Sequence, residues 1–180
     1  GLLAIFSNVM DTKRWVQATP AFVGFDVEDP ARTDRRAMIR AVEEQAAFSS
    51  RGHVKILEEL SGREFNEIYF TGGAAKGQLW PQIVADVLGV RVHIPVVKES
   101  TALGAALFAG LGVGLYKNLH EVTRNIVRIQ ETIEPNSNNR TAYDEVFGRW
   151  AAVYPRMLAL VEDGLLPPMW WPAGADQLDN

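Results

Sequence analysis

A pair of adjacent glycines, Gly72 and Gly73, lies where a predicted strand ends and a predicted helix begins. The strand is the short run Glu67–Thr71, and a second apolar run, Val90–Ile94, follows the helix. The helix is predicted from apolar residues at helical spacing: Leu79, Trp80, Ile83, Val84, Val87 and Leu88. Glycines in such a turn let main-chain N–H groups approach a flat or anionic ligand, and the helix dipole favours a phosphate there. The pattern is typical of a nucleotide site, and also of an α/β turn that binds nothing.

Two named phosphate-binding motifs are excluded by the residues of this turn. Gly72 and Gly77 have the outer spacing of a P-loop. However, Gln78 and Leu79 occupy the positions where that loop needs Lys and Ser or Thr. The turn also lacks the G-x-G-x-x-G pattern, and no acidic residue follows about twenty positions later at the end of a second strand. Lys76 is therefore not a Walker lysine, and we interpret it as a solvated loop residue.

The sequence offers no group that would act as a nucleophile, a general base or a metal cluster. The three histidines, His53, His93 and His120, are far apart and have no neighbouring ligand at metal spacing. We expect His53 to be partly buried on a helix, and His93 and His120 to lie at the surface. The paired glutamates at 43–44 and 58–59 are interpreted as solvated helix faces. We assign no catalytic residue and no metal ligand within this chain.

The amino-acid composition is that of an ordinary globular protein. Its 180 residues suit one domain with a core of its own, and it is 47% hydrophobic and 22% charged. A net charge of −4 without a basic run argues against a nucleic-acid partner. The absence of cysteine excludes disulfides and suits a reducing cytosol. No apolar stretch approaches the roughly 20 residues of a membrane span, so we expect no membrane partner and a cytoplasmic location.

The N-terminal part is predicted to contain two strands, Leu2–Phe6 and Phe22–Val27, joined by a polar turn at Asn8–Lys13. Because the first strand begins next to Gly1, with no preceding Met, we expect the chain to be a piece of a longer protein.

A long helix should follow, capped by Thr33 or Asp34 and closed by Ser61 and Gly62. Its expected core stripe consists of Ile39, Val42, Ala46, Ser49, His53, Ile56 and Leu60. Gly52 inside this helix costs about 1 kcal/mol relative to alanine, which suggests that backbone from another segment approaches the helix there.

Beyond the second central strand, Ser100 or Thr101 can cap a helix rich in small residues: Ala102, Gly104, Ala105, Ala106, Ala109 and Gly110. Small side chains allow tight packing against a sheet or helix, which is the simpler interpretation, or they leave room for an adenine ring. Leu119–Val127 is predicted to be helical, and Glu134–Arg140 to be a polar loop.

The last predicted helix opens with a capping box formed by Thr141 and Asp144, and Gly164 ends it. Its apolar stripe is Tyr143, Val146, Phe147, Trp150, Val153, Tyr154, Met157 and Val161. The apolar tail 165–180 is expected to pack on a protein surface. The order of all these elements predicts one α/β domain over residues 1–180, with helices covering a mixed sheet.

Three segments are similar to the second half of the FGGY family of carbohydrate kinases: residues 72–89, 95–106 and 110–116. They carry the runs Gly-Gly-Ala-Ala-Lys-Gly-Gln-Leu-Trp, Lys-Glu-Ser-Thr-Ala-Leu-Gly-Ala-Ala and Gly-x-Gly-x-Gly-Leu-Tyr. The resemblance implies a ribonuclease-H-like (actin-like ATPase) fold that lacks part of its first hairpin. It also implies a C-terminal nucleotide-binding domain without the N-terminal sugar-binding domain.

The resemblance further implies a nucleotide site at the glycine turn. The residues matched to the family's adenosine and α-phosphate turn are Gly72, Gly73, Ala74, Gly77 and Gln78. Gly77 and Gln78 replace polar residues found in some relatives, so we expect contacts through the backbone there and not through side chains.

ATP and Mg²⁺ are the implied cofactors, with magnesium held mainly by parts outside this chain. The implied partners are a small sugar-like substrate and the missing N-terminal domain, which would supply the catalytic aspartate. The chain alone is therefore expected to be inactive. The particular substrate stays open, so the chain could belong to a kinase for a pentulose, a hexulose or a polyol. A non-catalytic assembly module of the same fold is the other alternative. In the module, the small-residue helix and the Trp-rich tail would form a subunit interface, as in a homodimer.

Overall fold

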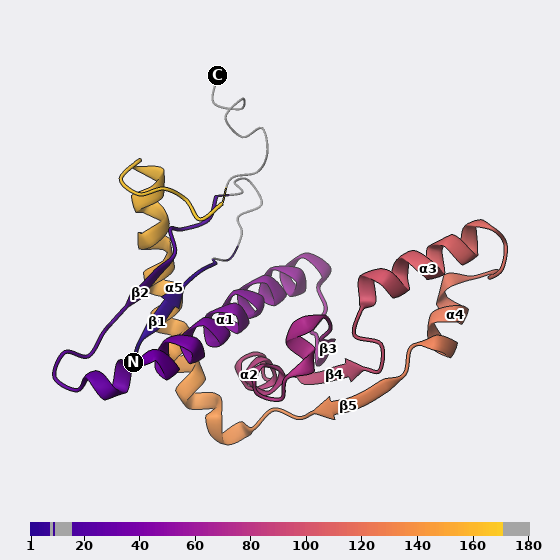
Figure 1. Ribbon diagram of the computed structural model, residues 1–180, viewed down its shortest axis with the longest axis horizontal. Coiled ribbons are helices and arrows are strands. Elements are labelled where there is room, and N and C mark those ends of the chain that lie inside the picture. The colour runs from indigo at the N-terminus through magenta and orange to yellow at the C-terminus, as the bar shows by residue number, and fades with distance from the viewer. Residues whose placement is uncertain (8, 10–15, 171–180) are drawn as a thin grey trace. The chain divides into compact units, whose positions relative to one another are not determined.

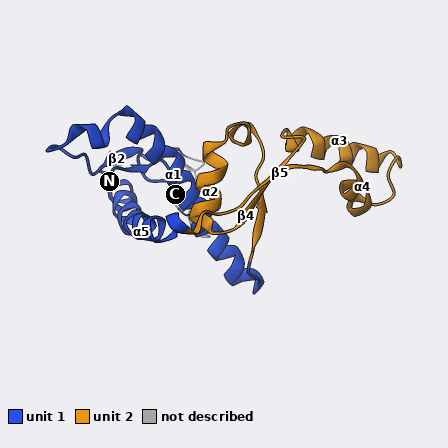
Figure 2. Cartoon of the chain, turned by 90° about the horizontal axis from the view of Figure 1, so that it is seen from below, with its two compact units in different colours: residues 1–64, 138–180 blue, residues 65–137 orange. Residues whose placement is uncertain are grey.

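The structure is a computed structural model, and it describes residues 1–7, 9 and 16–170 (Figure 1). The chain divides into two compact units, residues 1–64 with 138–180 and residues 65–137 (Figure 2). The prediction of a single domain stays a prediction. The predicted turn 8–13, apart from Val9, and the tail beyond Trp170 lie outside the described residues.

The first unit consists of a two-stranded sheet and two long helices. Strand β1 (Leu3–Ile5) pairs antiparallel with β2 (Ala21–Val23), and Ala4 lies opposite Phe22. Helix α1 (Arg35–Ser61) packs on β1, and α5 (Arg140–Glu162) contacts both α1 and β1. Both predicted strands are present but shorter than expected.

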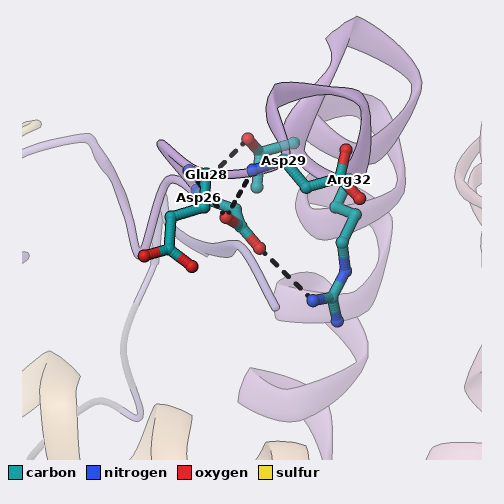
Figure 3. Close-up of polar contacts among 5 residues, drawn as sticks. Asp26, Glu28, Asp29 and Arg32 are labelled. Carbon is teal, nitrogen blue, oxygen red and sulfur yellow. Dashed lines mark hydrogen bonds and ion pairs between the residues drawn. The ribbon is translucent and has the colours of Figure 1, made fainter.

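The second strand ends early because Asp26 organises the next segment as a loop. Its carboxylate accepts hydrogen bonds from the main-chain N–H groups of Glu28 (3.1 Å) and Asp29 (2.9 Å). The same carboxylate pairs with the Arg32 guanidinium at 3.3 Å (Figure 3). Such Asx turns favour loops over strands. A 3₁₀ turn, Pro30–Thr33, then leads into α1.

The caps of α1 are those predicted. The Asp34 side chain accepts from the N–H groups of Arg36 and Ala37 at 2.9 and 3.0 Å. The hydrogen bond from Ala37 is the main reason that the pKa of Asp34 lies below its ordinary value. At the other end Gly62 adopts the left-handed conformation with φ +66°.

The predicted core stripe of α1 is wrong in register. Ile39 and Leu60 are 62% and 76% exposed. The buried positions are Ala41, Gln45, Ala47, Phe48, Ser49 and Gly52, so only Ser49 of the predicted stripe is fully buried. The real face combines small residues with Phe48, which lets the helix approach its neighbours closely. At Gly52 the approaching group is a side chain: an added Cβ would lie 2.1 Å from Val9 Cγ2.

An aromatic cluster joins α1 to α5. Trp150 is fully buried, and its ring centroid lies 5.9 Å from that of Phe48 and 4.7 Å from that of Tyr154. Tyr143 and Phe147 also contact Phe48. The predicted stripe of the last helix is confirmed, because Tyr143, Trp150 and Val161 are its buried residues.

The predicted capping box of α5 is wrong. The helix begins at Arg140, so Thr141 lies inside it, and the side chain at the cap position, Asn139, makes no cap bond. Asp144 instead forms ion pairs with Arg51 of α1 at 2.7 Å and with Arg140 at 3.1 Å. The Asp144 carboxylate thus makes charge-assisted hydrogen bonds to two guanidinium groups and not to the start of the helix.

The second unit contains a three-stranded mixed sheet. Strand β3 (Glu67–Tyr69) runs parallel to β4 (Arg91–Pro95), and α2 (Leu79–Leu88) is the crossover between them. Strand β5 (Ile129–Ile133) pairs antiparallel with β4. Sequence reasoning missed β5, because only its two ends are apolar and its residues are largely exposed. Its pairing is made by the backbone.

A buried carboxylate fixes α2 to the chain after β5. Asp86 is 4% exposed and accepts hydrogen bonds from the Gln82 side chain and from the main-chain N–H of Asn136, both at 2.8 Å. Gln82 also donates to the Glu134 carbonyl at 3.0 Å. A buried carboxylate needs such donors. The apolar face of α2 is Ile83, Val84, Ala85 and Val87.

Helices α3 (Ser100–Gly112) and α4 (Leu119–Ile126) pack against each other. Only Leu107 and Gly110 of α3 are buried, and the small residues Ala102, Ala105, Ala106 and Ala109 are exposed. The tight-packing prediction therefore holds at Gly110 alone, where an added Cβ would lie 2.5 Å from the Tyr116 ring. Among the described helices, none is both long and apolar enough to cross a membrane.

The aromatic cluster should dominate the stability of the first unit. Trp150→Ala is expected to lower the free energy of unfolding by about 3–5 kcal/mol, because it empties a buried site. Trp170→Ala is the matched control, since that side chain is 50% exposed and should change stability by less than about 0.5 kcal/mol. Urea unfolding of both variants checks this, and equal effects would contradict the packing described.

The Asp144 ion pairs predict a dependence on acid. Burial opposes ionisation of Asp144, but Arg51 and Arg140 outweigh it and hold its pKa below the ordinary value. Its contribution to stability is therefore present above about pH 4 and is lost as the pH falls through the folded-state pKa. Asp144→Asn should cost up to about 1 kcal/mol at pH 7 and little at pH 2, with Glu145→Gln as control. Urea midpoints measured against pH test this; a constant difference would refute it.

Candidate nucleotide-binding site

The predicted site lies where the parallel strands β3 and β4 end. Carboxyl ends of neighbouring parallel strands meet at one edge of a sheet, which is where α/β domains commonly bind ligands. The chain leaves β3 through Phe70 and Thr71 into the glycine turn, and leaves β4 into residues 96–99 before α3. The main-chain N–H of Gly72 donates to the Lys98 carbonyl at 2.8 Å and joins the two segments.

That bond corrects one expectation from the sequence. The sequence predicted that main-chain N–H groups of the glycine turn can approach a ligand, but the Gly72 N–H already has an acceptor. The Gly72 carbonyl also accepts from Ala75, at 3.2 Å. Within the part of the chain that the structure describes, the N–H groups of Gly73 and Ala74 have no acceptor. They are the first two N–H groups of a 3₁₀ turn, Gly73–Lys76, so the turn itself does not use them.

The glycines of the turn serve different purposes. Gly72 has φ +80° and ψ −164°, a conformation essentially restricted to glycine. Gly73 and Gly77 do not have a positive φ, and a Cβ added at either would meet nothing within 4 Å. Neither backbone conformation nor packing accounts for glycine at those two positions. The missing side chains leave the turn open to a ligand at Gly73 and Gly77.

Two side-chain contacts also connect the turn to the segment before α3. The hydroxyl oxygens of Thr71 and Ser100 lie 2.9 Å apart, and Lys76 pairs with Glu99 at 3.2 Å. The prediction that Ser100 or Thr101 caps α3 is wrong: the cap position is Glu99, and its side chain makes no cap bond. Sequence reasoning missed Thr71 and Lys98 as site residues, because nothing local indicates that the two strands pair in parallel.

The remaining predicted site residue, Gln78, occupies the cap position of α2 without a side-chain cap bond and is exposed. Trp80, two residues later, packs edge-on against Phe70 with 6.4 Å between ring centroids. Its indole N–H is buried and has no acceptor. The turn is therefore open to solvent on one side and packed on the other.

The histidines are structural or exposed. His93 was expected at the surface, but its side chain is 14% exposed and lies between Thr132 (2.8 Å) and Glu67 (3.2 Å). His53 is partly buried and His120 exposed, as predicted. Among the described residues, no group of three or more His, Asp or Glu side chains is placed to hold a metal ion.

A groove of about 470 Å³ lies elsewhere in the second unit, beside α4. It is lined by Leu115, Tyr116, Lys117, Asn118, Glu121, Val122, Asn125 and Ile126. None of these belongs to the glycine turn. We favour the turn as the site because two of its N–H groups have no acceptor among the described residues and the Cβ positions of Gly73 and Gly77 are open, whereas the groove is known only by its size and lining.

Comparison with known proteins identifies the family. A sequence model for the FGGY family of carbohydrate kinases, C-terminal domain, matches residues 12–113. The chain belongs to the FGGY family of carbohydrate kinases, and the part of the family that it matches is the C-terminal domain.

Curated relatives agree with this family, and solved structures agree with the fold. The autoinducer-2 kinases of Salmonella paratyphi B and Yersinia enterocolitica are each 42% identical to the chain over 170 residues, which is 94% of this chain and 32% of each kinase. The chain thus spans about a third of the length of these relatives. Plasmodium falciparum glycerol kinase with ADP superimposes with a TM-score of 0.66 at 23% identity, over 87% of this chain and 31% of that one. Rhodospirillum rubrum xylulose kinase also has a TM-score of 0.66, at 26% identity, over 87% and 30%. The predicted family and fold class are confirmed.

The different roles of the two glycines predict different costs of substitution. Gly72→Ala should lower the free energy of unfolding by about 1–3 kcal/mol, because alanine is strained at that φ and ψ. Gly73→Ala should change it by less than about 0.5 kcal/mol, since its Cβ meets nothing. Chemical denaturation of the two variants gives the comparison, and a tolerant Gly72 would show that the turn is built differently.

Proposed function

We propose that this chain is the ATP-binding half of an autoinducer-2 kinase, which transfers the γ-phosphate of ATP to a hydroxyl of the linear dihydroxypentanedione signal. Family membership supports an ATP-dependent carbohydrate kinase, and the 42% identity to autoinducer-2 kinases over 94% of the chain supports the particular substrate. The observation that carries the site is the turn at Gly73, where two neighbouring N–H groups have no acceptor among the described residues and an added Cβ would meet nothing within 4 Å.

The nucleotide-binding residues in this proposal are Gly72, Gly73, Ala74, Gly77 and Gln78. The N–H groups of Gly73 and Ala74 would donate to the nucleotide, where anionic oxygen at the start of a helical turn is favoured. Gly72 holds the turn in shape through its bond to Lys98. Gly77 keeps the approach free of a side chain. The glycerol kinase structure that shares this fold contains ADP, which is consistent with a nucleotide role.

The chain alone supplies one side of a catalytic cleft. Phosphoryl transfer needs in-line positioning of the acceptor hydroxyl and neutralisation of phosphate charge by Mg²⁺. From the family resemblance we assign the catalytic aspartate to the sugar-binding domain and most magnesium contacts to parts of the kinase outside this chain; the described residues contain no group of three or more acidic or histidine side chains that could hold a metal ion. The isolated chain should therefore bind nucleotide weakly and turn over nothing. Because ATP is the donor, the proposal places the enzyme in the cytoplasm.

Titration of the chain with ADP by calorimetry tests the proposal. We expect saturable ADP binding in the millimolar range. The chain alone should not convert ATP to ADP when sugars are added. Gly73→Val should abolish binding, because its branched side chain would occupy the approach, while leaving the unfolding midpoint unchanged. Gly148→Val is the matched control: Gly148 also has open space around its Cβ position but lies in α5. Equal binding by wild type and Gly73→Val would contradict the placement.

Further experiments on the chain distinguish the alternative functions. Restoring the sugar-binding domain and assaying phosphorylation of the signal, pentuloses, hexuloses and polyols identifies the substrate. A non-catalytic assembly module is favoured by exposed apolar residues in and after α3, such as Phe108 and Leu115, and in the described part of the tail, such as Leu165 and Trp170. That reading requires no saturable ADP binding, even with the second domain present, and a concentration-dependent homodimer by analytical ultracentrifugation.

A further inference from the structure

The segment between β4 and α3, residues 96–99, is held on two sides together with Ser100, the first residue of α3. On one side the Val96 N–H donates to the Arg128 carbonyl at 2.9 Å, and the Lys98 ammonium donates to Gln130 Oε1 at 2.6 Å. Gln130 belongs to β5 and Arg128 directly precedes that strand, so the segment is held against this part of the chain. The segment is therefore anchored independently of the glycine turn.

On its other side the same segment holds the turn by three contacts. The Lys98 carbonyl accepts the Gly72 N–H at 2.8 Å, the Thr71 and Ser100 hydroxyls lie 2.9 Å apart, and Lys76 pairs with Glu99 at 3.2 Å. The ion pair is exposed at both ends, with side-chain exposures of 62% and 68%, so it should contribute little. The two uncharged contacts flank the backbone that leads directly into Gly73.

We propose that Thr71 and Ser100 are positioning residues for the nucleotide, whose hydroxyl pair sets the orientation of the Gly73 and Ala74 N–H groups. This inference rests on the proposed function. The hydroxyl pair closes a small ring with the Gly72–Lys98 bond, so the turn is held at two adjacent residues instead of one. A single hydrogen bond would leave it able to pivot about Gly72, whose lack of a Cβ gives it wide conformational freedom. Pre-oriented donors bind more tightly because less freedom is lost on binding.

A double-mutant cycle in the chain tests the pair. Thr71→Val and Ser100→Ala should each weaken ADP binding roughly twofold to threefold, the lower end of the usual effect of one hydrogen bond, because the hydroxyl pair is exposed. The double variant should bind no more weakly than either single variant, because both remove the same contact. Thr71→Ser keeps the hydroxyl and should restore wild-type affinity. Glu99→Gln should have little effect. Thr123→Val, which removes a hydroxyl bonded to the Leu119 carbonyl in α4, should have none.

Amide hydrogen exchange of the ligand-free chain is the second measurement. Exchange at Gly72 should be severalfold faster in Thr71→Val and in Ser100→Ala, while the urea midpoint stays at the wild-type value. Unchanged exchange at Gly72 would overturn the inference whether or not ADP binds. Wild-type affinity in both single variants, or independent additive losses, would overturn it while leaving the proposed function intact. Failure of the wild-type chain to bind ADP, even with the sugar-binding domain restored, would overturn the proposed function itself.

Discussion

The parallel pairing of β3 with β4 is the constraint on which the candidate site depends. It brings the ends of both strands to one edge of the sheet, so that the Gly72 N–H reaches the Lys98 carbonyl and the Thr71 hydroxyl reaches Ser100. The crossover helix α2 secures the pairing through its buried apolar face and through Asp86, which binds the chain after β5. The turn is thus held from both flanking segments, and its shape is set before any ligand arrives.

Within that turn, the glycines divide into one that the fold needs and two that it does not. Gly72 has a backbone conformation that excludes other residues, and its N–H donates a hydrogen bond to the Lys98 carbonyl. Gly73 and Gly77 have ordinary conformations and open surroundings. Open surroundings alone do not mark a site, since Gly148 in α5 has them too; at Gly73 they coincide with an N–H group that has no acceptor among the described residues. Close approach of a nucleotide, as proposed above, would account for both features and agrees with the family.

Local signals in the sequence predicted the local features. Asp34 and Gly62 were identified as helix ends because capping depends on a few neighbouring residues, and the aromatic stripe around Trp150 was correct because large residues repeat at helical spacing. Features that depend on distant partners were not predicted. The buried face of α1 depends on small residues that fit against neighbouring elements. Strand β5 forms by backbone pairing with a distant strand. Asp144 pairs with Arg51 and does not form the predicted cap. The glycines of the turn led to the predicted site, which stays a prediction, and the residues that hold the turn follow only from the strand pairing.

The most direct measurement is a titration of the ¹⁵N-labelled chain with ADP, following each main-chain amide by NMR. The account predicts saturable shifts that are largest at Gly73, Ala74 and Gly77 and small along α1 and α5. Shifts confined to the groove at residues 115–126, or distributed without saturation, would contradict it.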